Sequence, residues 1–191
     1  MATQGMTGTG TWVVLPTYDE AENITPISRA ILAALPAATL LVVDDGSPDG
    51  TGRIADALAA VDPRIRVRHR AAKQGLGRAY LDGFGVALQG GAECIVQMDA
   101  DFSHDPAVLP DLLAPLERGS ADLVIGSRYT RGGGVGDWGL GRRLISRGGS
   151  LFARIVLGLP ADDLTGGFKA WRAPTLAAIP FDGIHAGGYV F

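Results

Sequence analysis

A chain of 191 residues with a 47% hydrophobic content is long enough to form one α/β domain with a complete core. Its net charge of −3 gives no electrostatic reason to expect a nucleic-acid partner. No apolar run reaches the roughly 18 residues that a membrane span needs. The single cysteine, Cys94, cannot form an internal disulfide, so the reducing cytosol is the simplest compartment.

The N-terminal part of the chain predicts a tail, a strand and a helix. Residues 1–11 are small, polar and glycine-rich and lack the basic and apolar regions of a signal peptide, so we expect a disordered tail. The apolar run 12–16 predicts the first strand, which Pro16 should end, and apolar residues at helical spacing predict a helix over 20–35. No Gly-x-Gly-x-x-Gly pattern lies between them, which excludes the dinucleotide site of a nicotinamide-dependent dehydrogenase.

A second strand is predicted over 39–43, where nearly every residue is apolar, as in a parallel sheet that is covered on both faces. Asp45, in the loop that follows, either accepts hydrogen bonds from a nucleotide base or ribose or belongs to a capped turn without a ligand. A helix over 53–61 and a strand over 65–69 come next. That strand alternates apolar and basic residues, which predicts a position near an edge of the sheet.

The next helix is predicted to run to residue 88, and it opens with the sequence KQGLGRA at 73–79. This sequence lacks the Gly-Lys-Ser/Thr ending of a Walker motif. Gly77 and Arg78 either approach a phosphate at the helix N-terminus or only allow the helix to pack closely.

Two aspartates, Asp99 and Asp101, follow an apolar strand that begins at Ile95. Because side chains alternate along a strand, both carboxylates should point to the same side. Two such carboxylates can hold one hard divalent cation, and ligands of open α/β sheets bind at the carboxyl ends of the strands. The alternative is a polar strand end that caps the next helix, which is expected over 106–118.

The rest of the chain predicts one more strand and several polar segments. The strand at 123–125 leads into Arg128. In a mostly parallel sheet this brings a cation to the same side as the two aspartates, at the carboxyl ends of the strands. The basic and apolar stretch 142–157 is either an amphipathic core helix with an arginine face or a helix that lies on a membrane surface. A last short helix is expected over 174–179.

Several motifs, in this order, resemble those of family 2 glycosyltransferases with the GT-A fold: PTYDEAEN at 16–23, VDDGSPDGT at 43–51 and MDADFSH at 98–104. The segments GSRY at 126–129, SRG at 146–148 and DLTGGF at 163–168 narrow the resemblance to dolichyl- or polyprenyl-phosphate mannosyltransferases. The resemblance implies an α/β fold, a three-layer α/β/α GT-A domain over 12–191. Members of this family commonly have Asn at the position of Asp19 and usually continue beyond Phe191, so we expect a C-terminally truncated domain.

The resemblance also implies a reaction, the inverting transfer of mannose from GDP-mannose to a polyprenyl (dolichyl) phosphate, with Mg²⁺ or Mn²⁺, by a cytoplasmic enzyme that is peripheral at the membrane surface. It assigns the donor to Pro16, Tyr18, Glu20, Val43, Asp45, Asp99, Ala100 and Asp101. It assigns the metal to Asp99, Asp101 and Ser103, the acceptor phosphate to Arg128 and Arg142, and catalysis to Asp99, Asp101 and Arg128.

A phosphate acceptor is already anionic near neutral pH, so its attack needs no general base, and we expect a single in-line displacement. Two alternatives stay open: a related lipid glycosyltransferase that uses another nucleotide sugar such as UDP-glucose, and an inactive nucleotide-sugar-binding fragment. A metal-dependent sugar nucleotidyltransferase is disfavoured because the segment 16–20 supplies no glycine-rich loop after the first strand.

Overall fold

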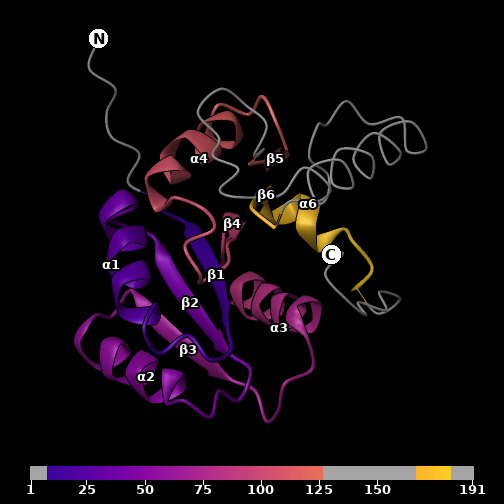
Figure 1. Cartoon of the computed structure of the whole chain (residues 1–191). Helices are drawn as coiled ribbons and strands as arrows, with labels where there is room; N and C mark the ends of the chain where they lie inside the picture. Colours follow the sequence, from indigo (N-terminus) through magenta and orange to yellow (C-terminus); the bar gives the residue numbers. More distant parts are fainter. Residues whose placement is uncertain (1–7, 127–166, 182–191) are drawn as a thin grey trace, which may run out of the picture.

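The structure, a computed structural model, describes residues 8–126 and 167–181 (Figure 1). Within these residues, six strands form one sheet in the order β3-β2-β1-β4-β6-β5. The strands are β1 (Thr11–Thr17), β2 (Thr39–Asp44), β3 (Ile65–His69), β4 (Cys94–Gln97), β5 (Leu123–Ile125) and β6 (Lys169–Arg172). The helices are α1 (Ile24–Ala34), α2 (Thr51–Val61), α3 (Leu76–Gln89), the 3₁₀ helix η1 (Pro106–Val108), α4 (Leu109–Glu117) and α6 (Ala173–Ala177).

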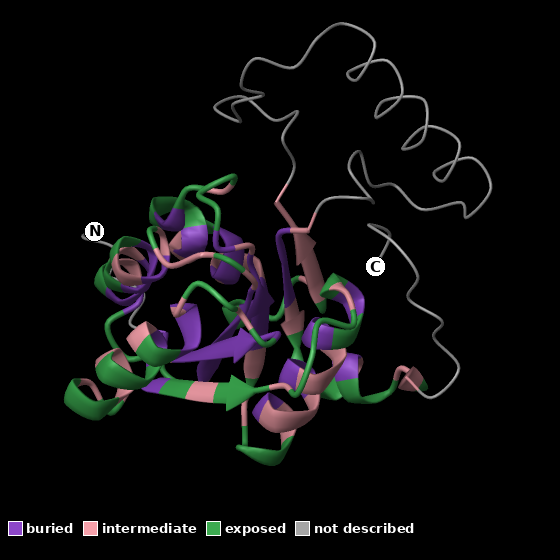
Figure 2. Ribbon diagram, turned by 60° about the horizontal axis from the view of Figure 1, so that its bottom comes forward, coloured by how far each residue is buried: buried purple, intermediate pink, exposed green. Residues whose placement is uncertain are grey.

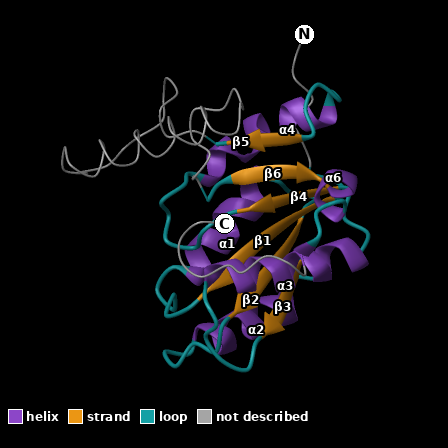
Figure 3. Cartoon of the chain, turned by 90° about the vertical axis from the view of Figure 1, so that its right-hand side faces the viewer, coloured by secondary structure: helices purple, strands orange, loops and turns teal. Residues whose placement is uncertain are grey.

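The sheet is mostly parallel, as the alternation of strands and helices predicts. β1 pairs in parallel with β2 and β4, and β2 pairs in parallel with β3. β6 is antiparallel to both of its neighbours, β4 and β5, and the sequence did not indicate this strand. Figure 3 looks onto the sheet and shows the β6 arrow pointing opposite to those of β4 and β5. Helices cover both faces of the sheet, α1 and α2 on one side and α3 on the other (Figure 1), which confirms the three-layer α/β/α architecture.

Each face of the sheet packs against its own helices. In β1, Val13 and Leu15 belong to a core that is shared with α1, α2 and α4. The alternate residues Trp12 and Val14 belong to a second core, which is shared with α3 and α6. Figure 2 shows the inner strands buried between these layers. β3 lies at the edge, as expected, and its two arginines are exposed.

Two predicted boundaries near the carboxyl end of β1 were wrong, namely the end of the first strand and the start of the first helix. Pro16 does not end β1. The Val14 carbonyl accepts from Met98 after β4, and Pro16, two residues later, faces the same side. Because the β1–β4 pairing stops at Val14, the missing N–H of Pro16 costs no ladder hydrogen bond. The first helix begins at Ile24 rather than at Glu20, since residues 20–23 form a turn in which the Glu20 carbonyl accepts the N–H groups of residues 23 and 24.

None of the helices in the described residues is long and apolar enough to cross a membrane. The tail was predicted over 1–11, but Thr11 already belongs to β1. Residues 1–7 of that tail, the arginines at 128 and 142 and the basic stretch 142–157 lie outside the described residues.

Candidate active site

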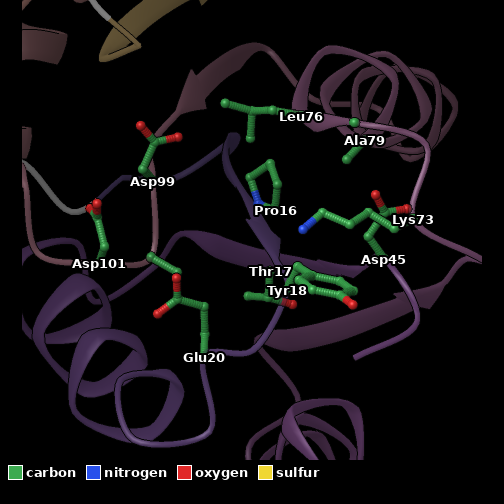
Figure 4. Close-up of a pocket in the computed structure, with 12 residues that line it drawn as sticks. Pro16, Thr17, Tyr18, Glu20, Asp45, Lys73, Leu76, Ala79, Asp99 and Asp101 are labelled. Atoms are coloured by element: carbon green, nitrogen blue, oxygen red, sulfur yellow. The ribbon is translucent and has the colours of Figure 1, made fainter. Parts of the chain in front are cut away.

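A cleft opens where β1 and β4, which are neighbours in the sheet but far apart in the sequence, end side by side (Figure 4). The chain leaves β1 toward β2 on one side and reaches β4 on the other, so this is the switch point at which open α/β sheets bind ligands. The cleft has a volume of about 490 Å³. It is lined by Pro16, Thr17, Tyr18, Glu20, Asp45, Lys73, Gly75, Leu76, Ala79, Asp99, Ala100 and Asp101.

All predicted donor-binding residues except Val43 line this cleft. The Val43 side chain is fully buried in the core that β2 shares with α3. Ser103 does not line the cleft; it is exposed, and its backbone N–H donates to the Asp101 carboxylate at 2.9 Å. The structure therefore brings together residues that follow three different strands.

Asp45 is a nearly buried carboxylate that is held from two directions. The Arg70 guanidinium donates to one of its oxygens, and the two side chains are only 6% and 10% exposed. The backbone N–H of Gln74 donates to the other oxygen at 3.0 Å. This arrangement fixes the carboxylate at the cleft and ties the loop that carries Lys73 to the end of β2.

The loop that begins α2 holds the segment after β1. Three side chains of this loop, Ser47, Asp49 and Thr51, accept the backbone N–H groups of residues 19, 21 and 20, at 3.2, 2.9 and 2.9 Å. Asp19 has a φ of 60°, a left-handed conformation that Asp and Asn adopt more readily than other side chains. An aspartate therefore suits the backbone at this position.

Asp99 lies between helix α3 and the segment before β6. The Tyr80 hydroxyl donates to its Oδ1 at 2.7 Å. The pKa of Tyr80 is raised well above its ordinary value, mainly by burial and secondly by the charge of Asp99. The hydroxyl therefore stays protonated and donates. On the other side, a Cβ on Gly167 would lie 3.0 Å from Oδ2, so a larger residue at this position would press on the Asp99 carboxylate.

The residues after Asp101 form a turn that packs on the segment before β6. Phe102 has a φ of 57°, which is rare for a bulky side chain, and is 43% exposed. The His104 ring stacks on Phe168 with centroids 4.8 Å apart. The two motifs at 98–104 and 163–168 therefore meet beside the cleft, through their residues at 99, 104, 167 and 168.

The acidic pair fits a divalent cation that a bound ligand helps to coordinate. Asp99 and Asp101 both line the cleft from the end of one strand, and Mg²⁺ commonly binds through one or two carboxylates plus substrate phosphates. Within 8–126 and 167–181, no group of three or more side chains is placed to hold a metal by itself. The phosphates of a ligand would have to supply the remaining oxygen ligands.

Lys73 is a cleft residue that the sequence reasoning missed. Its Nζ lies 3.5 Å from the centroid of the Tyr18 ring, a cation–π contact, and it is the one cationic side chain among the described residues of the lining. The sequence had drawn attention to Gly77 and Arg78 instead. Gly77 is buried and Arg78 is exposed outside the lining, whereas Gly75 and Leu76 place the N-terminus of α3 at the cleft.

Comparisons with known proteins agree with this geometry. Residues 12–177 match the family model described as Glycosyl transferase family 2. An undecaprenyl-phosphate mannosyltransferase from Micrococcus luteus is 48% identical over 178 residues, which cover 93% of this chain and 72% of that protein. A polyprenol monophosphomannose synthase from Mycolicibacterium smegmatis is 46% identical over 182 residues, 95% of this chain and 68% of that protein.

Solved structures of glucosyl-3-phosphoglycerate synthase from Mycobacterium tuberculosis share the fold. The complex with phosphoglyceric acid has a TM-score of 0.70 and 26% identity and covers 95% of this chain and 62% of that chain. The complex with Mn²⁺ and UDP-glucose has a TM-score of 0.69 and 25% identity and covers 95% and 61%. The chain thus spans less than two thirds of these structures. From its sequence match and its fold, the chain belongs to glycosyl transferase family 2 with the GT-A fold, among relatives that are named polyprenyl-phosphate mannosyltransferases.

Proposed function

We propose that this protein transfers mannose from GDP-mannose to a polyprenyl phosphate, with inversion at the sugar carbon and dependence on Mg²⁺ or Mn²⁺. The observation that carries the proposal is the position of Asp99 and Asp101 in one cleft with Tyr18 and Asp45, in a chain whose relatives are named for mannosyl transfer to polyprenyl phosphates. The acidic pair suits the diphosphate end of a nucleotide sugar, and the other two residues suit its nucleoside.

The cleft offers partners for each part of a nucleotide-sugar donor, from the base to the diphosphate. A nucleobase would pack against the Tyr18 ring beside, or in place of, the Lys73 ammonium that lies over it. Asp45 offers an acceptor for N–H or ribose hydroxyl donors. The diphosphate would lie near Lys73 and the N-terminus of α3, where a positive charge and unpaired backbone N–H groups favour an anion. Asp99 and Asp101 would hold the cation, which offsets the charge that develops on the leaving diphosphate.

The acceptor is a phosphate that attacks the sugar directly. Its oxygen is already ionised, so this chain needs to supply no general base, and one in-line displacement inverts the sugar carbon. The acceptor must be held close to another anion, the donor diphosphate. We assign this task to Arg128 and Arg142 from the sequence motifs, since a guanidinium binds phosphate in a bidentate manner. Because its acceptor is a lipid, the protein would work peripherally at a membrane surface, and we propose the cytoplasmic side.

A second donor, UDP-glucose, is favoured by one observation: a complex of the structurally similar glucosyl-3-phosphoglycerate synthase contains Mn²⁺ and UDP-glucose. Two assays separate the donors. Thermal unfolding with each nucleotide sugar and Mn²⁺ should show protection by GDP-mannose and little by UDP-glucose. Radiolabelled sugar should then appear in the lipid phase with GDP-mannose and a short polyprenyl phosphate. Protection and transfer with UDP-glucose alone would replace the first proposal by the second, and binding without transfer would indicate an inactive binding fragment.

A further inference from the structure

Tyr80 is a buried tyrosine whose hydroxyl points at the acidic pair rather than at solvent. It lies on α3, is 1% exposed and packs against Phe84 with ring centroids 5.8 Å apart. Its ring fills the core that α3 shares with the sheet. That packing needs an aromatic ring but no oxygen, so the hydroxyl is a separate feature that the fold alone does not require.

The Tyr80 hydroxyl holds one oxygen of the Asp99 carboxylate, and the chain at Gly167 passes close to the other. Tyr80 donates to Oδ1 at 2.7 Å, and the space next to Oδ2 is so narrow that a Cβ on Gly167 would lie 3.0 Å away. Rotation of this carboxylate about its last torsion would break the hydrogen bond from Tyr80. Asp101, by contrast, is exposed and accepts a hydrogen bond from the backbone N–H of Ser103 in its own turn.

We propose that Tyr80 is a positioning residue: its hydroxyl orients the Asp99 carboxylate so that the acidic pair is preorganised for a divalent cation. The inference rests on the proposed function, since it requires that Asp99 binds this cation. Groups that orient a metal-binding carboxylate change metal affinity by about 10–100-fold when they are removed. The alternative is that Tyr80 only fills the core and that Asp99 merely satisfies its hydroxyl.

The Tyr80→Phe variant tests the proposal because it removes one oxygen and leaves the packing ring in place. Binding of MnCl₂ in the presence of GDP is followed by the electron paramagnetic resonance signal of free Mn²⁺, and GDP binding in EDTA is followed by calorimetry. We expect the Mn²⁺ concentration at half-saturation to rise about 10–100-fold. GDP affinity in EDTA should be unchanged. The Mn²⁺ concentration for half-maximal transfer should rise by the same factor, with little change in rate at saturating Mn²⁺.

Two controls separate positioning from packing. Phe84→Leu perturbs the same core one turn further along α3, so it should lower the melting temperature and leave the Mn²⁺ half-saturation unchanged. If Tyr80 acts through Asp99, adding Tyr80→Phe to Asp99→Asn should cause no further loss of Mn²⁺ affinity.

The possible results lead to different conclusions. A wild-type Mn²⁺ half-saturation in Tyr80→Phe, or an equal shift in Phe84→Leu, overturns the positioning role while the proposed function stands. GDP binding and transfer by the wild-type protein that do not depend on Mn²⁺ overturn the proposed metal dependence and, with it, the role of Tyr80.

Discussion

Replacing Arg70 by Met should destabilise the protein far more than the same change at Arg68, two residues earlier. The Arg70 guanidinium pairs with Asp45, and both side chains are almost buried. Arg68 pairs with Asp82 at 3.0 Å, but its own side chain is 52% exposed. The Arg70 Nε also lies 3.6 Å from the Asp82 carboxylate. Arg68→Met therefore removes only an exposed ion pair, whereas Arg70→Met removes the buried pair with Asp45 and this longer contact with Asp82.

The burial of each pair sets the size of the effect. Removing one partner of a buried ion pair costs about 3–5 kcal/mol, because the other charge stays buried without compensation. Asp45 would keep the N–H of Gln74, so we expect a loss near the lower end, about 3 kcal/mol. The exposed pair of Arg68 should be worth about 0–1 kcal/mol.

Urea unfolding of the two variants and the wild type measures this difference, provided that the slope of the free energy against urea stays constant. Arg70→Met should also weaken GDP binding, since Asp45 lines the cleft. Adding Asp45→Asn to Arg70→Met should recover part of the lost stability, because the uncompensated charge is gone. Equal losses of less than about 1 kcal/mol in Arg70→Met and Arg68→Met would refute the reasoning that burial makes the Asp45 pair strong.

Three further predictions follow from single contacts. Gly83→Ala should lower the free energy of unfolding by about 1–3 kcal/mol, because the new Cβ would lie 2.4 Å from a Val14 methyl group, and chemical denaturation measures it. Lys73→Met should weaken GDP-mannose binding about tenfold in calorimetry, since it removes one charge-assisted contact worth about 1.4 kcal/mol. The melting temperature should change little, because Lys73 lies in an exposed loop. Asp49→Asn should flatten the loss of melting temperature on acidification. Hydrogen bonds from Thr51 lower the pKa of Asp49 below 3.8, so its stabilising effect is present above the unfolded-state pKa and is lost as the pH falls below about 4.

Each of these predictions has a matched control or a contradicting result. Gly85→Ala lies on the same helix with no atom within 4 Å of the new Cβ, so it should stabilise the protein by up to about 1 kcal/mol; equal effects at both glycines would contradict the packing argument. Unchanged donor affinity in Lys73→Met would remove the lysine from the donor site. An acid transition of Asp49→Asn with the wild-type slope would show that the Asp49 carboxylate does not contribute.

The sequence indicates the parallel half of the fold and the acidic residues of the cleft because both depend on local patterns. Apolar runs predicted β1, β2 and β4. Asp45, Asp99 and Asp101 each come after such a run, which predicted that they meet at the carboxyl ends of the strands. The structure confirms this meeting. Their roles toward donor and metal stay predictions, as do those of Arg128 and Arg142.

The contacts that the sequence did not indicate join residues far apart in the chain. β6 has only four residues with charged ends, and only its pairing with β4 and β5 identifies it as a strand. The Trp171 Nε1 donates to the Gln97 side chain, which lies 74 positions earlier in the chain. Tyr80 occupies an apolar face of α3, where its spacing with Phe84 indicates a core residue and gives no sign of Asp99. Such contacts follow from the packing of the layers and not from any local period.

The most direct test of the central claim is transfer of labelled mannose from GDP-mannose to a short polyprenyl phosphate, measured with Mn²⁺ and with EDTA for the wild type and for Asp101→Ala. We predict label in the lipid phase for the wild type with Mn²⁺, none with EDTA, and almost none for Asp101→Ala, because the cation would lose one of its two carboxylates. Wild-type turnover by Asp101→Ala, or equal transfer in EDTA, would contradict the assignment of this cleft as a metal-dependent mannosyltransferase site.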